Sequence, residues 1–169
     1  MGRFALDLAH MLAGGMVLVS FMLLYQNRMF GLLNVFALHA VVLSASVAWQ
    51  AHVQAAPHLY VTAAIALLLK AIVIPVALRR MVIRLGIHRS IETVGGIGLT
   101  MLMGIALVAL SMMVMLQAAA EADPLAREDV ALALSVILLG LLMMVTRYNA
   151  VSQIVGFMSL ENGLILAAA

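Results

Sequence analysis

Long apolar runs separated by short polar connections make up almost the whole chain. Six of these runs are about 20 residues long, which is the length a helix needs to cross a hydrocarbon core of about 30 Å. They cover residues 6–25, 29–49, 59–78, 94–117, 130–146 and 150–169. No run alternates like a half-buried strand, and a backbone in lipid must satisfy its own hydrogen bonds. The pattern therefore predicts an all-α fold, a polytopic bundle of six transmembrane helices.

The connections between the runs are too short to separate domains. They occupy residues 26–28, 50–58, 79–93, 118–129 and 147–149, so we expect one integral membrane domain over residues 1–169. The first run is too long for a signal peptide, and no small-residue cleavage site follows it. The last run ends on three alanines without a polar flank. Either a partner covers this end or the native protein continues past residue 169 into another helix, and we expect the second.

Composition narrows the class of protein further. Hydrophobic residues make up 66% of the chain and charged residues 9%, and the mean hydropathy is +1.20, which excludes a soluble domain of this length. Cysteine is absent, so the chain supplies no disulfide, iron–sulfur cluster or thiolate metal site. The basic residues lack interleaved aromatics, which argues against nucleic-acid binding. No nucleophile–base set is visible, so we expect no catalysis, cofactor or metal in this chain itself.

The arginines are distributed unevenly between alternate connections. One set of connections carries Arg28, Arg79, Arg80, Arg84, Arg89 and Arg147. The opposite side has two arginines with four acidic residues nearby: Arg3, Arg127, Glu121, Asp123, Glu128 and Asp129. The positive-inside rule places the first set in the cytoplasm and the N-terminus outside.

Three ionisable side chains, His39, Lys70 and Glu161, lie near the middle of their predicted helices. At 1.5 Å per residue each is roughly 14–16 Å from an end of its helix. A charge at that depth costs about 3 kcal/mol or more, so such groups face the bundle interior and pair with one another or line a hydrated path. We expect Lys70 and Glu161 to meet, either as a structural ion pair or as part of a proton path.

A proton path suits the chemistry of this pair. Burial and a neighbouring ammonium act in opposite directions on the proton affinity of a carboxyl group, so such a pair can exchange a proton near neutral pH. Four polar residues of the last helix are candidates to hold waters along the route: Ser152, Gln153, Ser159 and Asn162. His39 is either a proton carrier or a hydrogen-bonded packing residue. Haem is not expected, because no second histidine lies at matching depth.

Several other features bear on helix packing and on access to the path. Asp7 and His10 are three residues apart on one helical face and form either the outer mouth of a path or a solvated helix end. Pro75 removes a backbone hydrogen bond five residues after Lys70 and should kink the third helix. The small residues Gly96, Thr100 and Gly104 form a stripe typical of close helix packing.

Two stretches of the sequence resemble a known family. They are LLLKAIVIPVALRRMVIRLGIHR (residues 67–89) and TRYNAVSQIVGFMSLENGLILAA (residues 146–168), and they resemble the hydrogenase-4 component E family. Members of that family are membrane subunits of group 4 [NiFe] hydrogenases and formate hydrogenlyase-like complexes, and they are similar to the K subunit of complex I. The number of helices agrees with the family over nearly the whole chain, and the two stretches carry the specific resemblance.

The resemblance implies that the protein is a subunit of a complex in a bacterial inner membrane. Its partners would be antiporter-like proton-pumping subunits and the subunit that anchors the redox arm, and the partners would hold all redox chemistry. The basic turn and buried glutamate of the K subunit match Arg147, Asn149 and Glu161, and the first hairpin repeats the pattern with Arg28 and His39. Two other interpretations stay open: a subunit of a multisubunit cation/proton antiporter, and a passive spacer between pumping subunits.

Overall fold

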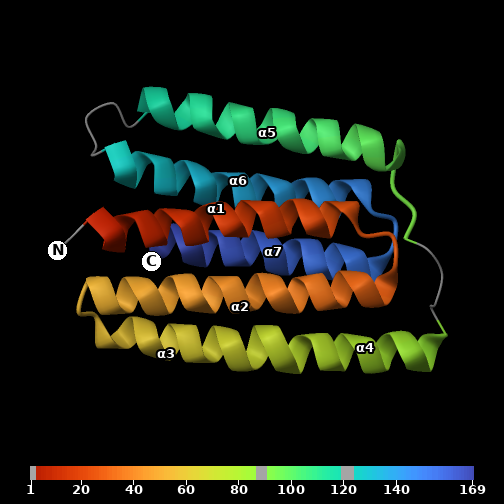
Figure 1. Ribbon diagram of the computed structural model, residues 1–169. Helices are drawn as coiled ribbons and strands as arrows, with labels where there is room; N and C mark the ends of the chain where they lie inside the picture. The colour runs from red at the N-terminus through yellow and green to blue at the C-terminus, as the bar shows by residue number, and fades with distance from the viewer. Residues whose placement is uncertain (1–2, 87–90, 119–123) are drawn as a thin grey trace.

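The computed structural model describes residues 3–86, 91–118 and 124–169, and these residues fold into a bundle of long helices (Figure 1). The elements in chain order are α1 (Arg3–Tyr25), α2 (Met29–Val53), α3 (Pro57–Ile65), the π-helical segment η1 (Ala66–Val73), α4 (Ile74–Leu85), α5 (Gly96–Ala118), α6 (Pro124–Thr146) and α7 (Ala150–Ala168). The all-α prediction is confirmed. Over the described ranges, six helices are long and apolar enough to cross a membrane, with α3, η1 and α4 counting as one.

Two helices extend further than the apolar runs predict. The third span runs from Pro57 to Leu85, so Arg79, Arg80 and Arg84 lie on a helix and not in a connection as expected. Arginine is a good helix former, and its long side chain can carry the charge away from an apolar helix, so hydropathy falls before the helix ends. Gly86 then stops α4 with a φ of 64°, a left-handed conformation that glycine adopts without strain.

The fifth of the six spans, α6, likewise begins earlier than predicted. It starts at Pro124, not at residue 130, and its first two turns contain Arg127, Glu128 and Asp129. Proline suits a first helical position because its fixed φ matches the helix and its missing N–H has no helical partner there. Among the charges used for the topology prediction, Arg89, Glu121, Asp123 and the side chain of Arg3 lie outside the described residues.

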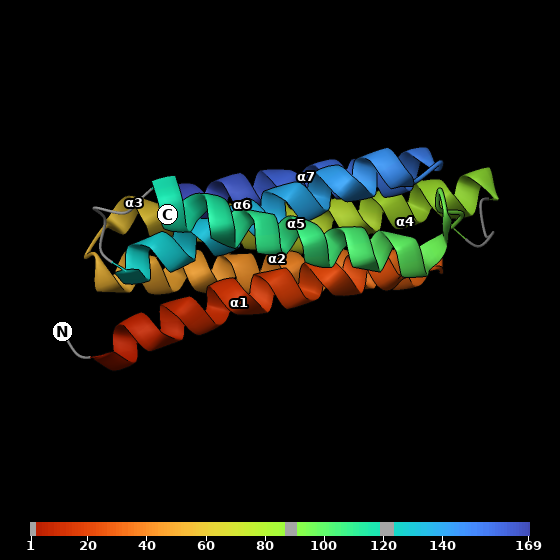
Figure 2. The same ribbon diagram turned by 90° about the horizontal axis from the view of Figure 1, so that it is seen from above.

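The helices pack side by side with alternating direction (Figures 1 and 2). Helix α5 packs on α6 at one flank, and the rod made of α3, η1 and α4 packs on α2 at the other. Helices α1 and α7 overlap in Figure 1 but lie on opposite sides of the bundle in Figure 2, with α1 in contact with α2 and α6, and α7 in contact with the same two helices. The centre of the protein is therefore formed by α1, α2, α6 and α7.

The contact between α6 and α7 depends on glycine. A Cβ on Gly140 would lie 2.6 Å from the backbone nitrogen of Leu160, and one on Gly156 would lie 3.1 Å from the carbonyl oxygen of Gly140. A Cβ on Gly163 would lie 2.9 Å from the backbone nitrogen of Ile137. Small residues let two helix backbones approach closely where lipid provides no hydrophobic drive. These three glycines therefore set the position of α7 against α6.

The stripe of small residues on α5 is partly used as expected. Thr100 and Gly104 are buried, and a Cβ on Gly104 would lie 2.9 Å from the ring of Phe21 on α1. Gly96 is exposed and has a φ of 82°, so it begins the helix and does not extend the packing face.

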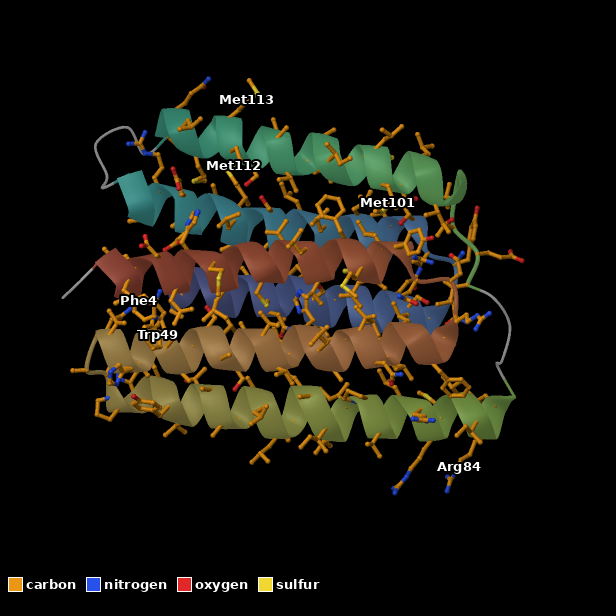
Figure 3. The ribbon with its side chains drawn as sticks, in the orientation of Figure 1. Phe4, Trp49, Arg84, Met101, Met112 and Met113 are labelled. Carbon is orange, nitrogen blue, oxygen red and sulfur yellow. The ribbon has the colours of Figure 1, made fainter. Side chains whose placement is uncertain are left out.

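The alternate connections gather at opposite ends of the bundle. At one end the backbone nitrogen of Ile91 donates to the carbonyl oxygen of Asn27, and Thr93 bridges to Arg147. At the other end the indole nitrogen of Trp49 donates to the carbonyl oxygen of Ala5 at 2.8 Å. Figure 3 shows Trp49 and Phe4 at this second end and Arg84 pointing outward near the first. The two sets of connections in the topology prediction are thus at separate ends.

Arg147 is buried, unlike Arg28, Arg79, Arg80 and Arg84, the other described arginines of its end. Only 1% of it is exposed, and its Nη2 donates to the carbonyl oxygen of Leu24 near the end of α1. Burial lowers the pKa of this guanidinium from its ordinary value. The turn between α6 and α7 is therefore hydrogen-bonded to the end of α1.

Candidate functional site

Five side chains from four elements form a continuous set of polar contacts at the centre of the bundle. Lys70 Nζ lies 3.1 Å from Glu161 Oε2 and donates to Asn162 Oδ1 at 2.9 Å. Asn162 Nδ2 lies 3.0 Å from His39 Nδ1, and His39 Nε2 lies 2.9 Å from Ser20 Oγ. We call Glu161, Lys70, Asn162, His39 and Ser20 the polar chain.

The polar chain runs from the surface of the bundle into its interior. The side chain of Glu161 is 41% exposed, whereas that of Lys70 is 11% exposed and Asn162 is fully buried. His39 is also fully buried, and Ser20 is 2% exposed. Because Ser20 belongs to α1 and Glu161 to α7, the chain crosses between helices that lie on opposite sides of the bundle in Figure 2.

Lys70 occupies an unusual piece of backbone. It lies within η1, the π-helical segment that ends two residues before Pro75. Proline has no N–H and cannot continue the normal helical ladder, and π-helical segments often occur at functional sites. The disturbance expected from Pro75 is thus accompanied by a change of helix type in the segment that carries the buried lysine.

With Lys70 charged, the donors and acceptors of the polar chain allow one consistent assignment of hydrogens. A charged lysine only donates, so the oxygen of the Asn162 amide faces it and the amide nitrogen donates to His39 Nδ1. The hydroxyl of Ser20 donates to the carbonyl oxygen of Met16 at 2.8 Å, so its oxygen accepts from His39 Nε2. His39 is therefore neutral in this arrangement, with its proton on Nε2.

The structure brings together the three ionisable residues singled out from the sequence. The expected meeting of Lys70 and Glu161 is confirmed by their 3.1 Å contact. His39 joins them through Asn162, which the sequence suggested only as a site for water. Ser20 was missed. Its place in the buried face of α1, four residues after Met16 and three before Leu23, is the signal that could have found it.

The other polar residues of α7 do not extend the polar chain. Ser152 and Ser159 are buried, and the hydroxyl of Ser152 has no hydrogen-bond partner in the described part of the protein. Gln153 donates from Nε2 to the carbonyl oxygen of Arg147, at the end of the helix. Asn149 caps α7 by accepting from the backbone nitrogen of Val151 at 2.8 Å.

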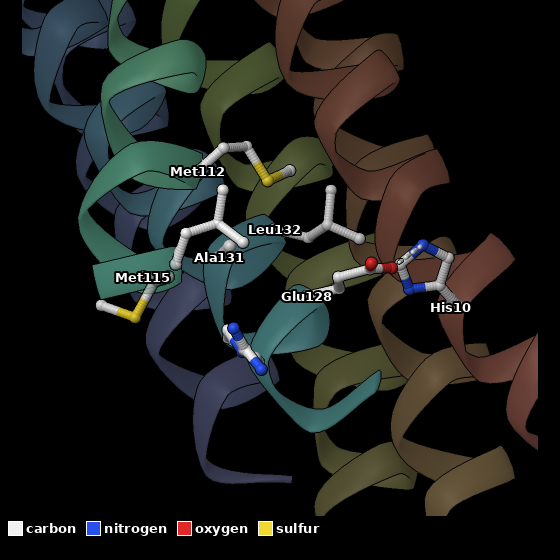
Figure 4. Close-up of a pocket in the computed structure, with 8 residues that line it drawn as sticks. His10, Met112, Met115, Glu128, Ala131 and Leu132 are labelled. Carbon is white, nitrogen blue, oxygen red and sulfur yellow. Dashed lines mark ion pairs between the residues drawn. The ribbon is translucent and has the colours of Figure 1, made fainter. Parts of the chain in front are cut away.

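The proposed outer mouth has a different structure from the one its spacing indicates. His10 pairs across to α6, with Nδ1 2.9 Å from Asp129 Oδ1 and Nε2 3.4 Å from Glu128 Oε2. Figure 4 shows His10 and Glu128 at a pocket of about 190 Å³, together with Met112, Met115, Ala131 and Leu132. Asp7 is exposed and does not line this pocket.

The pocket and the polar chain are separated along α1. Ser20 lies ten residues after His10, which corresponds to about 15 Å of helix. In residues 3–86, 91–118 and 124–169, no chain of hydrogen bonds links the two places. The pocket is therefore treated separately from the polar chain.

Comparison with other proteins gives no further assignment. No protein-family model matches the chain, and no curated protein or solved structure matches it either. Among the described residues, no group of three or more His, Cys, Asp or Glu side chains could hold a metal ion. The polar chain combines three ionisable side chains with an amide and a hydroxyl, each at hydrogen-bonding distance from the next.

Proposed function

We propose that this protein is a non-catalytic membrane subunit that conducts protons along the polar chain. The observation that carries the proposal is the unbroken series of contacts from the partly exposed carboxylate of Glu161 to the buried imidazole of His39. Ionisable groups inside a membrane are costly and commonly mark proton relays. Glu161 is the end of the polar chain that reaches the surface of the bundle, because its side chain alone among the three ionisable groups is substantially exposed.

The extent of the polar chain supports conduction over a purely structural ion pair. Neutralising the charge of Lys70 requires only Glu161, yet Lys70 also donates to Asn162, which in turn contacts His39. An imidazole can accept a proton at one ring nitrogen and release one from the other. A proton relay needs each of its groups to lie within hydrogen-bonding distance of the following one. Each of the four contacts in the polar chain is 3.1 Å or shorter.

The assembly that we propose for this subunit is a complex I-related oxidoreductase of the group 4 membrane-bound hydrogenase type. The support is the resemblance of residues 67–89 and 146–168 to the hydrogenase-4 component E family. In this proposal the protein lies in a bacterial inner membrane between antiporter-like pumping subunits and the anchor of the redox arm. The end of the bundle that carries Arg28, Arg84 and Arg147 faces the cytoplasm, on the positive-inside rule.

The test of conduction is Glu161→Gln in the assembled complex. Glutamine keeps the size and hydrogen-bonding capacity of glutamate but does not titrate. We expect normal abundance of the complex, unchanged electron transfer to artificial acceptors, and a several-fold fall in proton translocation in inverted vesicles. Glu161→Asp should give an intermediate rate, since a carboxylate remains. Glu92→Gln is the matched control, because Glu92 is exposed and lies outside the polar chain.

Two results would favour the other interpretations. Full translocation by an assembled Glu161→Gln complex would contradict the relay and support a passive spacer. Purification of the protein with cation/proton exchange subunits, and without redox subunits, would instead support a multisubunit antiporter. Both measurements use the native membrane assembly.

A further inference from the structure

Asn162 lies between Lys70 and His39 in the polar chain, and its amide side chain does not titrate. We propose that its amide lets either Lys70 or His39 carry a positive charge, but not both at once. Asn162 is then a positioning residue that determines which side chain holds the charge. The inference deepens the proposed function, and it rests on hydrogen-bond geometry that can be measured without measuring transport.

The argument follows from what an amide presents to its two neighbours. One end of the Asn162 side chain is a carbonyl oxygen, which only accepts, and the other is an NH2 group, which donates. Lys70 Nζ lies 2.9 Å from the oxygen, and His39 Nδ1 lies 3.0 Å from the nitrogen. With Lys70 charged, the oxygen must face Lys70, so His39 Nδ1 must accept a hydrogen bond and carry no proton.

The reverse arrangement is also consistent. If His39 carries two protons, its Nδ1–H requires an acceptor, so the Asn162 amide must turn by 180° and present its oxygen to His39. The NH2 group then faces Lys70, whose nitrogen has a lone pair to accept it only when the amine is neutral. The total number of protons on the two side chains is the same in both arrangements.

The remaining combination, with both side chains charged, leaves two donors facing each other. Whichever way the amide points, its NH2 group would meet an N–H of Lys70 or of His39. Asn162 is fully buried, as is His39, so bulk water is not at hand to accept these hydrogens. Leaving buried donors unsatisfied is costly, which disfavours the doubly charged state beyond simple charge repulsion.

The other groups facing these residues act in the same direction. Glu161 contacts Lys70 at 3.1 Å and favours a charge there, on the side away from His39. Ser20 presents its oxygen to His39 Nε2 and uses its hydroxyl proton on the carbonyl oxygen of Met16. Helices α1, α2, α7 and η1 supply these contacts, and the described structure gives no further charged group in contact with the polar chain.

The test is the protonation pattern of His39, read by magic-angle-spinning NMR. The full chain is labelled with 15N-histidine and 15N-lysine and reconstituted in lipid bilayers, and the signals of His39 are those missing from a His39→Gln sample. Lys70 is the one lysine of the sequence, so its Nζ shift shows whether it is an ammonium or a neutral amine. The 15N shifts of the imidazole distinguish a protonated nitrogen from an unprotonated one. We expect a proton on Nε2 and none on Nδ1.

Asn162→Asp changes the amide donor to a carboxylate of the same shape. Both oxygens of the carboxylate accept, so His39 Nδ1 should become protonated while Lys70 keeps its partner. Asn149→Asp is the matched control: Asn149 accepts from a backbone nitrogen at the start of α7, a role that aspartate also fills, so the signals of His39 should not change. Lys70→Met is a second variant. It frees the amide to turn, so the protonated fraction of Nδ1 should rise.

A wild-type protein in which both imidazole nitrogens of His39 carry protons while Lys70 is an ammonium would overturn the inference whatever the variants do. So would an unprotonated Nδ1 in Asn162→Asp. These outcomes are independent of the transport assay: full translocation by Glu161→Gln with the expected His39 pattern would refute proton conduction and leave the assignment of Asn162 intact. The opposite pair of results would refute the assignment and leave conduction intact.

Discussion

Replacing Gly140 with alanine should weaken the packing of α6 on α7. The added Cβ would lie 2.6 Å from the backbone nitrogen of Leu160 and 2.9 Å from the carbonyl oxygen of Gly156. Ordinary contact begins at 3.4 Å, so the helices would have to separate locally by about 0.8 Å. Both clashing groups are backbone atoms, so no side-chain rotation relieves the overlap. We expect a loss of about 1–3 kcal/mol in the free energy of unfolding.

The assay is reversible unfolding of the full chain in mixed micelles with an increasing fraction of denaturing detergent. Gly14→Ala is the matched control, because Gly14 lies inside α1 and nothing is within 4 Å of its added Cβ. Alanine favours helix over glycine, so this control should be neutral or more stable by up to about 1 kcal/mol. A change of less than about 0.5 kcal/mol in Gly140→Ala, or equal effects in the two variants, would refute the close-packing argument.

Two further predictions concern the ion pair and the topology. Lys70→Met and Glu161→Gln should each lower the free energy of unfolding of the chain in mixed micelles, because removing one partner leaves a charge without its counterion. The double variant should lose less than the sum of the two effects, and strict additivity would contradict the contact. The chain lacks cysteine, so Arg84→Cys and Gln54→Cys each introduce a single thiol. A membrane-impermeant thiol reagent should label Arg84→Cys from the cytoplasm and Gln54→Cys from the outside. Labelling of both from one side would contradict the topology.

The number of helices could be predicted from the sequence because each apolar run alone is long enough to span a membrane. The ends of the helices could not. Hydropathy falls at Arg79, yet the backbone continues as a helix to Gly86, because arginine favours helix and its charge can reach beyond the apolar region. Helix α6 begins at Pro124, ahead of its apolar run, for a similar reason. Its first turns carry charged residues, which lower the hydropathy but do not prevent helical hydrogen bonds.

The candidate site, like the fold, could be predicted from the sequence only in part. The pairing of Lys70 with Glu161 could be predicted, because opposite charges in an apolar interior must neutralise each other. The link from Asn162 to His39 and Ser20 depends on which face α7 turns toward α2. That rotation is set by backbone contacts such as the one at Gly163, and a hydropathy pattern carries no information about such contacts.

The buried guanidinium of Arg147 has a consequence for how the protein is made. It binds the carbonyl oxygen of Leu24, a position 123 residues earlier in the chain. A ribosome adding roughly 5–20 residues per second would expose Leu24 some 6–25 s, to order of magnitude, before Arg147 is synthesised. Until then the last turn of α1 lacks a native partner for a carbonyl that the helix itself cannot satisfy. Insertion of the α6–α7 hairpin is therefore the event that completes the first helix, so this contact closes only after α6 and α7 have entered the membrane.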